Sequence, residues 1–256
     1  MDTVNANVVI PPFRYVGSKI QDLDKIILPI RKTYVEVFGG TGAVLLNRPR
    51  SEVDVYCDIN PEITNVYTQV RDNADELVDM LRFVMVSRKL FIRKPPTSDV
   101  ARAADWLHKR NISFSGCGSS FSRPTKTHNS MSSAMRHRFS FLRKVSQRLQ
   151  GVQILNIPYQ ESIQRFDSPD TVFYFDLPYV GIGHVYGYRL TDYQQEEFIE
   201  RVRRCHGFCV ISGYAHPIYD KYSWNRTIEW SKRVSCQIKA APAKEKLWIF
   251  NGVADR

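Results

Sequence analysis

The stretch that most constrains the fold is residues 173–179, an apolar run that ends in an acid, a proline and an aromatic residue. Successive aromatic residues at 173–175 favour a strand covered on both faces, as in a parallel sheet. Pro178 has no N–H for the next ladder hydrogen bond, so we expect the strand to end before it. Asp176 and Tyr179 are therefore predicted at the carboxyl end of a core strand, where open α/β sheets bind their ligands. A strand that simply ends in a polar turn is the alternative.

A glycine-rich turn follows another apolar run. Residues 34–38 predict a strand, and Gly39-Gly40-Thr41-Gly42 then leads into an apolar helix start. The next predicted strand, residues 53–57, is followed by Asp58, nineteen residues after Gly39. Glycines let the backbone approach a ligand closely, and an acid at this distance commonly binds the ribose hydroxyls of a nucleoside. The pattern is not the dinucleotide G-x-G-x-x-G, so a cofactor without phosphates, such as S-adenosylmethionine, fits better than a dinucleotide. A structural loop is the alternative.

The segment Gly17-Ser18-Lys19 precedes a helical pattern through Leu23, Ile26 and Ile27. Free backbone amides, a hydroxyl and a cation at a helix start would suit an anion such as the carboxylate of S-adenosylmethionine. A glycine turn with a solvated lysine is the other interpretation.

Positive charge is concentrated in residues 82–148. This stretch holds ten arginines and five lysines against two acids, a net charge of +13, while the rest of the chain carries −3. Such clustering favours a nucleic-acid surface over an ordinary solvated face. Residues 111–129 are rich in serine and glycine and predict a loop that reads bases, or a disordered one. The flanking residues 101–109 and 135–149 predict helices.

The remaining segments alternate helices and strands. Residues 192–205 predict an amphipathic helix, and residues 208–212, 227–236 and 246–250 predict strands. This alternation around a helical insertion indicates an α/β sheet.

The five cysteines are scattered and odd in number, which predicts reduced thiols rather than a disulfide framework. Cys205-His206 with Cys209 has no second ligand pair, so buried core thiols are favoured over a metal site. No apolar run reaches the roughly 20 residues that span a membrane, and no signal pattern opens the chain, so a cytoplasmic protein is expected.

Four motifs in this order make the chain similar to the Dam-type (D12 class) DNA N6-adenine methyltransferases. They are Arg14-Tyr15-Val16-Gly17-Ser18-Lys19 for K/R-W/Y-x-G-[GS]-K, Phe38-Gly39-Gly40-Thr41-Gly42 for [FE]-x-G-x-G, Asp58-Ile59-Asn60 for D-I-N, and Asp176-Leu177-Pro178-Tyr179 for D-P-P-Y. Near the end of the chain, the segment Glu245-Lys246-Leu247-Trp248-Ile249-Phe250 resembles an acidic-apolar strand that the family often has there. Order and spacing match over nearly the whole chain.

The resemblance implies a Rossmann-like S-adenosylmethionine-dependent methyltransferase sheet of seven strands with a final antiparallel strand. Residues 1–80 and 150–256 would form the catalytic domain, and residues 81–149 an inserted, mostly helical DNA-recognition domain. The implied activity is methyl transfer from S-adenosylmethionine to N6 of an adenine flipped out of double-stranded DNA. We expect no metal, no membrane association, and a monomer or weak dimer.

The resemblance also implies roles for individual residues. Cofactor contacts are expected at Tyr15, Lys19, Phe38, Gly39, Gly40, Gly42, Asp58 and Asp176, and catalytic positions at Asp176, Leu177, Pro178 and Tyr179. From the basic insertion we expect DNA contacts at Arg110, Asn111, Phe114, Arg123, Lys126, Arg136 and Arg138. The adenine N6 amine is a poor nucleophile because its lone pair is delocalised into the ring. Two acceptors on its N–H groups, Asp176 and the carbonyl of residue 177, would concentrate electron density on the nitrogen.

One residue departs from the family pattern: Leu177 stands where the family most often has proline. The acceptor is the main-chain carbonyl, which survives the change, and Pro178 still biases residue 177 toward an extended conformation. The lost ring restriction is worth about 0.4–1 kcal/mol, so we expect an active enzyme with a slower or slightly looser site.

Other interpretations are methylation of N4 of cytosine, an RNA substrate, and a catalytically silent DNA-binding protein that retains the fold. A dinucleotide-dependent dehydrogenase is disfavoured by the basic insertion and the incomplete glycine pattern.

Overall fold

The computed structural model describes residues 8–84, 86–113, 116–121, 131–178, 190–232 and 243–253. The chain forms two compact units. The sheet unit comprises residues 28–39, 50–59 and 157–256, and the helical unit comprises residues 1–27, 40–49 and 60–156. Each unit is built from segments that are far apart in the sequence.

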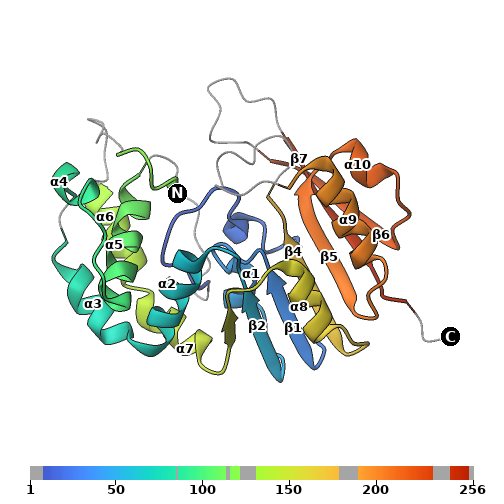
Figure 1. Ribbon diagram of the computed structural model, residues 1–256, viewed down its shortest axis with the longest axis horizontal. Coiled ribbons are helices and arrows are strands. Elements are labelled where there is room, and N and C mark those ends of the chain that lie inside the picture. Colours follow the sequence, from blue (N-terminus) through green and yellow to red (C-terminus); the bar gives the residue numbers. More distant parts are fainter. Residues whose placement is uncertain are drawn as a thin grey trace. The chain divides into compact units, whose positions relative to one another are not determined.

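The described strands form a mixed seven-stranded sheet in the order β3-β2-β1-β4-β5-β7-β6 (Figure 1). Their bounds are β1 Thr33–Val37, β2 Val53–Cys57, β3 Gln153–Leu155, β4 Thr171–Asp176, β5 Phe208–Tyr214, β6 Arg226–Lys232 and β7 Ala243–Phe250. β1 is parallel to β2 and to β4, and β4 is parallel to β5, whereas β7 is antiparallel to both β5 and β6. Seven strands with a final antiparallel one confirm that part of the predicted fold.

The strand predicted around residue 173 is β4, and its apolar run is fully buried. Val172, Phe173, Tyr174 and Phe175 each have 0% of their surface exposed. In a strand that is covered on both faces, polar and apolar residues do not alternate, and for this reason the strand could be predicted from its continuous apolar sequence.

α8 (Tyr159–Phe166) and α9 (Asp192–Val202) cover the same face of the sheet, the near face in Figure 1, and α10 (Pro217–Asp220) follows β5. An aromatic cluster joins these helices to the strands. Phe198 of α9 lies 5.0 Å from Phe175, 5.2 Å from Tyr159 and 6.0 Å from Phe38, measured between ring centroids. Edge-to-face pairs at these separations add to the hydrophobic gain of burial, so they stabilise the position of Phe38, the residue after β1.

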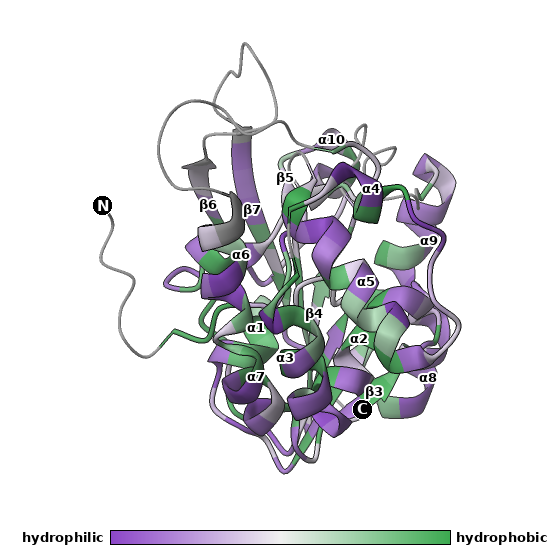
Figure 2. Cartoon of the chain, turned by 90° about the vertical axis from the view of Figure 1, so that its left-hand side faces the viewer, coloured by the Kyte–Doolittle hydropathy of each residue, from purple (hydrophilic) through white to green (hydrophobic). Residues whose placement is uncertain are grey.

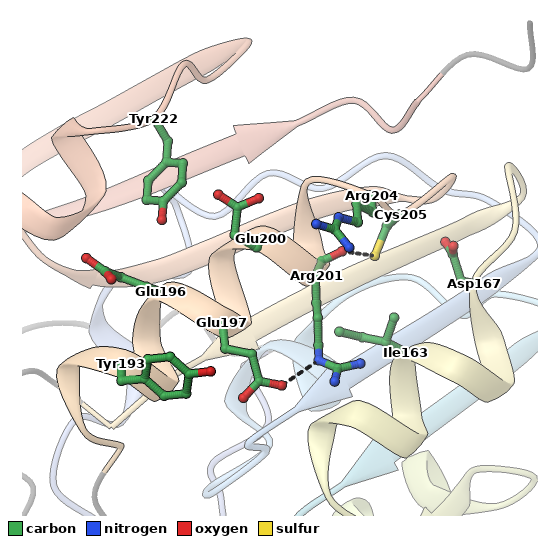
Figure 3. A pocket seen from close by; sticks show the side chains of 10 residues that line it. All are labelled: Ile163, Asp167, Tyr193, Glu196, Glu197, Glu200, Arg201, Arg204, Cys205 and Tyr222. Carbon is green, nitrogen blue, oxygen red and sulfur yellow. Dashed lines mark hydrogen bonds and ion pairs between the residues drawn. The ribbon is translucent and has the colours of Figure 1, made fainter.

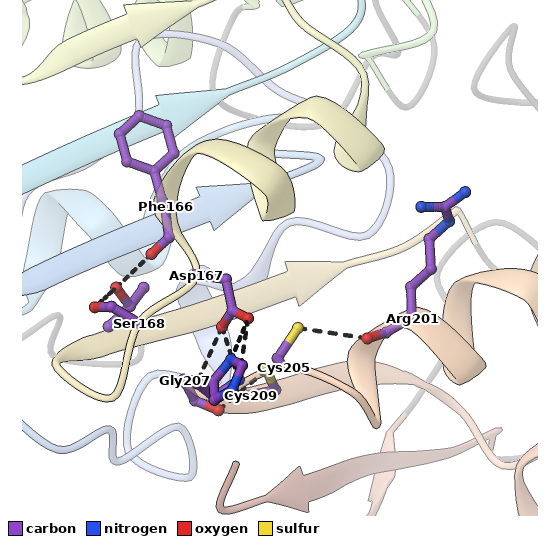
Figure 4. A network of polar contacts seen from close by, with 9 residues as sticks. Phe166, Asp167, Ser168, Arg201, Cys205, Gly207 and Cys209 are labelled. Carbon is purple, nitrogen blue, oxygen red and sulfur yellow. Dashed lines mark hydrogen bonds and ion pairs between the residues drawn. The ribbon is translucent and has the colours of Figure 1, made fainter. Parts of the chain in front are cut away.

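The loops before β4 and β5 are joined by hydrogen bonds at the amino end of the strands (Figure 4). Asp167 accepts from the backbone N–H groups of His206 and Gly207, both at 2.9 Å. Cys205 and Cys209 lie here, 1% and 0% exposed, and are free thiols, as predicted. Burial raises the pKa of the Cys209 thiol well above its usual value, so it stays protonated.

The helical unit contains η1 (Lys19–Gln21), α1 (Ala43–Asn47), α2 (Pro61–Asp72), α3 (Ala74–Arg82), α4 (Arg88–Phe91), α5 (Asp99–Ile112), α6 (Met131–Phe139) and α7 (Leu142–Leu149). α7 shows why these helices pack: it carries both hydrophobic and hydrophilic residues (Figure 2), and Leu142, Val145 and Leu149 are buried. The helical structure predicted over residues 135–149 is confirmed, with a break at Ser140 and Phe141 that divides it into α6 and α7. The Ser140 hydroxyl donates to the carbonyl of His137 at 2.7 Å, a local bond that competes with helix continuation, and the chain restarts as α7.

The prediction of a helix after Lys19 is wrong, since only the 3-10 turn η1 forms there. Pro29 biases the residue before it toward an extended backbone, and the stretch between η1 and Pro29 is too short to sustain a helix. Ile27, which the pattern placed on the apolar face, is 84% exposed. Among the described residues no helix is long and apolar enough to cross a membrane.

Candidate active site

Three parallel strands of the sheet unit, β2, β1 and β4, end in one row, and β5 passes through this row before it ends at Tyr214. Val37 pairs with Cys57 on one side and with Phe175 on the other, and Phe175 pairs with Ile211. The next residues on β2, β1, β4 and β5 are Asp58, Phe38, Asp176 and Ser212. The register therefore aligns three predicted site residues along the carboxyl ends of adjacent strands, where this class of sheet binds ligands.

The Asp176 carboxylate is oriented by a buried hydrogen-bond relay. The Ser212 hydroxyl donates to Asp176 Oδ1 at 2.9 Å, and the Tyr174 hydroxyl donates to Ser212 Oγ at 3.0 Å. Ser212 and Tyr174 are 0% exposed. In such surroundings these bonds hold the side chain in one orientation. Ser212 was not among the predicted site residues, although it ends an apolar run on a predicted strand in the same way as Asp176.

The turn after β1 is strained and tightly packed. Phe38 has a φ of +57°, a left-handed conformation that costs a non-glycine residue about 1–2 kcal/mol and that often marks functional sites. A Cβ on the following Gly39 would lie 2.2 Å from Cε2 of Tyr56, whose ring is 0% exposed. Only glycine fits there, so the glycine has a packing reason as well as the predicted ligand-binding one.

Gly39→Ala is accordingly expected to lower the free energy of unfolding by about 1–3 kcal/mol, because the new methyl group overlaps the Tyr56 ring. Thermal unfolding of the purified protein measures this as a fall of about 2–4 °C for each kcal/mol. The matched test is Gly39→Ala combined with Tyr56→Leu, which makes room for the methyl group. The double variant should be more stable than the sum of the single effects predicts, and strict additivity would contradict the packing explanation.

The other predicted cofactor residues lie in the helical unit and also gather in one place. Ser18 and Thr41 share a hydrogen bond between their hydroxyls at 3.0 Å, and the Tyr67 hydroxyl donates to the Thr41 carbonyl at 2.5 Å. Gly42 has a φ of 56° and is the N-cap of α1. Lys19 is 1% exposed, and its Nζ donates to the Gly17 carbonyl at 3.3 Å. The segment around Tyr15 and Lys19 is thus joined to the glycine turn.

The predicted DNA contacts occupy different environments. Arg136 is exposed on α6, whereas Arg110 and Arg138 are half-buried and Asn111 is buried on α5. The predicted residues Phe114, Arg123, Lys126 and Tyr179 lie outside the described residues.

A pocket of about 640 Å³ runs along α9 in the sheet unit (Figure 3). Tyr193, Glu196, Glu197, Glu200, Arg201, Arg204 and Cys205 line it, with Ile163, Asp167 and Tyr222. Glu197 and Arg201 pair across one turn of the helix at 2.9 Å, a common surface arrangement. The pocket contains none of the predicted site residues, so it is not the candidate active site despite its volume. In the part of the chain that is described, no group of three or more His, Cys, Asp or Glu residues could hold a metal ion.

The family model for D12 class N6 adenine-specific DNA methyltransferases matches residues 15–235. That span contains both groups of predicted site residues, from Tyr15 to Asp176, and the basic stretch between them. The adenine specificity of the family favours N6 of adenine over the cytosine amine. The chain therefore belongs to the D12 class of N6 adenine-specific DNA methyltransferases, S-adenosylmethionine-dependent enzymes that methylate N6 of adenine in DNA.

Proposed function

We propose that this chain binds S-adenosylmethionine and methylates an adenine that has been flipped out of duplex DNA. The observation that carries the proposal is the row of Asp58, Phe38 and Asp176 at the carboxyl ends of β2, β1 and β4. It provides an acid for a nucleoside at the end of β2 and a second acid for the reacting amine at the end of β4, on either side of β1.

The residues of the sheet unit fit a nucleoside cofactor. Asp58 is 8% exposed and stands one residue beyond β2, where a carboxylate can accept from two ribose hydroxyls. The left-handed Phe38 and Gly39, which packs against the Tyr56 ring, form the tight turn at the end of β1 that we assign to this cofactor. In the helical unit we assign Tyr15, Lys19, Gly40 and Gly42 to the same cofactor, with Lys19 opposite its carboxylate.

The chemistry requires acceptors rather than a covalent nucleophile. S-adenosylmethionine supplies an electrophilic methyl group when it is bound. Asp176 accepts from one N–H of the adenine amine, and the main-chain carbonyl of Leu177 accepts from the other, so electron density rises on N6. Ser212 keeps Asp176 Oδ1 in place, and Pro178 restricts the backbone at Leu177. Tyr179 is assigned to stack on the flipped base and offset part of its unstacking cost.

Duplex DNA is assigned to the inserted residues 81–149. Their excess of positive charge suits the phosphate backbone, and exposed side chains such as Arg136 on α6 are available to it. Base reading is assigned to the loop that holds Phe114, Arg123 and Lys126. We expect the enzyme to act as a monomer or weak dimer.

The test is transfer of labelled methyl from S-adenosylmethionine to unmethylated duplex DNA, with the product nucleosides resolved. Label in N6-methyladenine supports the proposal, and a preference for duplex over single-stranded DNA and RNA supports the assigned substrate. Cofactor and DNA binding without any label would show a silent DNA-binding protein and overturn it.

Ser212→Ala is expected to slow methyl transfer by about ten-fold, because Asp176 loses the donor that orients it. Single-turnover transfer at saturating cofactor and DNA measures this step. Ser162→Ala is the matched control, since Ser162 of α8 is also 0% exposed but donates to the carbonyl of Pro158, the N-cap of that helix. Equal rates for the two variants would show that Ser212 has no orienting role.

A further inference from the structure

Arg110, near the end of α5, is enclosed by its own unit. One terminal guanidinium nitrogen donates to the carbonyl oxygens of Gly116 at 2.8 Å and Cys117 at 2.7 Å. The guanidinium carbon lies 4.7 Å from the ring centroid of Trp106 and 5.1 Å from that of Tyr15. Both separations are within the range of cation–π attraction, so the guanidinium joins two rings and a loop into one cluster.

Two observations show how closely this cluster is packed. The Arg110 guanidinium is partly withdrawn from water, and this burial lowers its pKa below the usual value. In these less polar surroundings its contacts with the protein are stronger. Gly116 has a φ of +73°, and a Cβ there would lie 2.4 Å from the carbonyl oxygen of Arg14. The loop that accepts from Arg110 therefore lies directly against the backbone that precedes Tyr15.

The chain just before Tyr15 is anchored to the same helices. Asn111 Nδ2 donates to the Pro12 carbonyl at 3.0 Å, and Arg138 of α6 donates to the Pro11 carbonyl at 3.2 Å. Between these points and Tyr15, the Phe13 ring meets Trp106 edge-on at 4.8 Å. Residues 11–15 are thus fixed at successive points by side chains of α5 and α6.

We propose that Arg110 is a positioning residue for the cofactor: it holds the Tyr15 ring in place, while Asn111 and Arg138 hold the chain that leads to it. The inference rests on the proposed function, in which Tyr15 contacts S-adenosylmethionine. A guanidinium committed to two carbonyls and two rings does not serve as a phosphate contact. The residues expected to bind DNA therefore divide into those that support the cofactor motif and those that face outward, such as Arg136.

The first test compares Arg110→Lys and Arg110→Gln by calorimetric binding of S-adenosylmethionine without DNA. Lysine keeps the charge but lacks the planar fork and the stacking surface, so both variants should bind the cofactor about ten-fold more weakly. Their affinity for duplex DNA, followed by fluorescence anisotropy, should stay near that of the wild type. The matched variant Arg136→Gln should show the reverse, with weaker DNA binding, a shallower salt dependence and normal cofactor binding.

A double-mutant cycle separates positioning from general destabilisation. If Arg110 acts through Tyr15, Arg110→Lys should add little to the loss of cofactor affinity that Tyr15→Leu already causes. Thermal unfolding of all four proteins identifies any variant that fails to fold, and Arg201→Lys, at a surface pair in the sheet unit, controls for loss of an arginine.

Normal cofactor binding by Arg110→Gln, with weakened and less salt-dependent DNA binding, would overturn the inference and make Arg110 a phosphate contact. Additive losses in the cycle would overturn it as well. These results require a wild-type protein that binds S-adenosylmethionine. Failure of the wild type to bind it would instead refute the proposed function, and the inference with it.

Discussion

Asp176→Ala is expected to lower the rate of methyl transfer by about 10²–10³-fold, the usual cost of removing one aligned electrostatic group from a reacting centre. The carboxylate is the acceptor assigned to the adenine amine, and Ser212 donates to its Oδ1 at 2.9 Å. Single-turnover transfer of labelled methyl to duplex DNA, at saturating cofactor, measures the loss directly.

Two further variants sharpen this prediction. Asp176→Asn keeps one acceptor oxygen and should fall between the wild type and the alanine variant. Asp170→Asn changes an exposed acid just before the amino end of the same strand and should leave the rate unaltered. A normal rate for Asp176→Ala, with normal binding of DNA and cofactor, would place the acceptor elsewhere in the chain.

Asp58→Ala is expected to weaken binding of S-adenosylmethionine by at least about 10²-fold, because two ribose hydroxyls lose a charged acceptor and each such hydrogen bond contributes a net of roughly 1.5–3 kcal/mol. Calorimetry with the cofactor, or with its demethylated product, measures this without turnover. At saturating cofactor the rate should recover most of its wild-type value, because the interaction is made equally in the ground state and the transition state.

The control for Asp58 is its amide. Asp58→Asn keeps one acceptor oxygen and should bind the cofactor more tightly than Asp58→Ala. Unchanged cofactor affinity in both variants would show that Asp58 does not contact the ribose. The assignment of the active site to the carboxyl ends of these strands would then rest on Asp176 alone.

The core strands could be predicted because strands that are buried on both faces have mostly apolar sequences. β1, β2, β4 and β5 begin and end within two residues of their predicted bounds. β7 begins three residues before its prediction, because Lys244 and Glu245 interrupt the apolar signal. The order of strands could not be derived from runs, since a local pattern does not specify which strand lies beside it.

The candidate site was predicted in part for the same reason. Asp58 and Asp176 follow apolar runs, so their positions at strand ends could be predicted from the sequence. Ser212 was not recognised, because its importance comes from the pairing of β4 with β5 and not from its own neighbourhood. The charge count likewise identified a basic segment but not the direction of each side chain. Asn111 lies one helical turn after the buried Leu107, a spacing that would have indicated its inward position.

Leu177, the departure from the family pattern, is 3% exposed. A proline at this position would restrict the backbone but would fill less of the space that leucine occupies. Burial of the leucine side chain contributes roughly 1.5–3 kcal/mol, more than the lost ring restriction, so packing is a second means of fixing the carbonyl that we propose as an acceptor.

The pairing of β1 with β4 has a consequence for how the enzyme is made. Thr33 pairs with Thr171, and the chain between them contains α1 through α8. Closing so long a loop is entropically costly, and sheets rich in such distant pairings fold slowly. On the ribosome, the basic helices are complete before β4 has been synthesised, and the carboxylate of Asp176 gains its serine partner only after β5 emerges. A nascent chain therefore carries the basic segment that we propose binds DNA well before its candidate active site is complete.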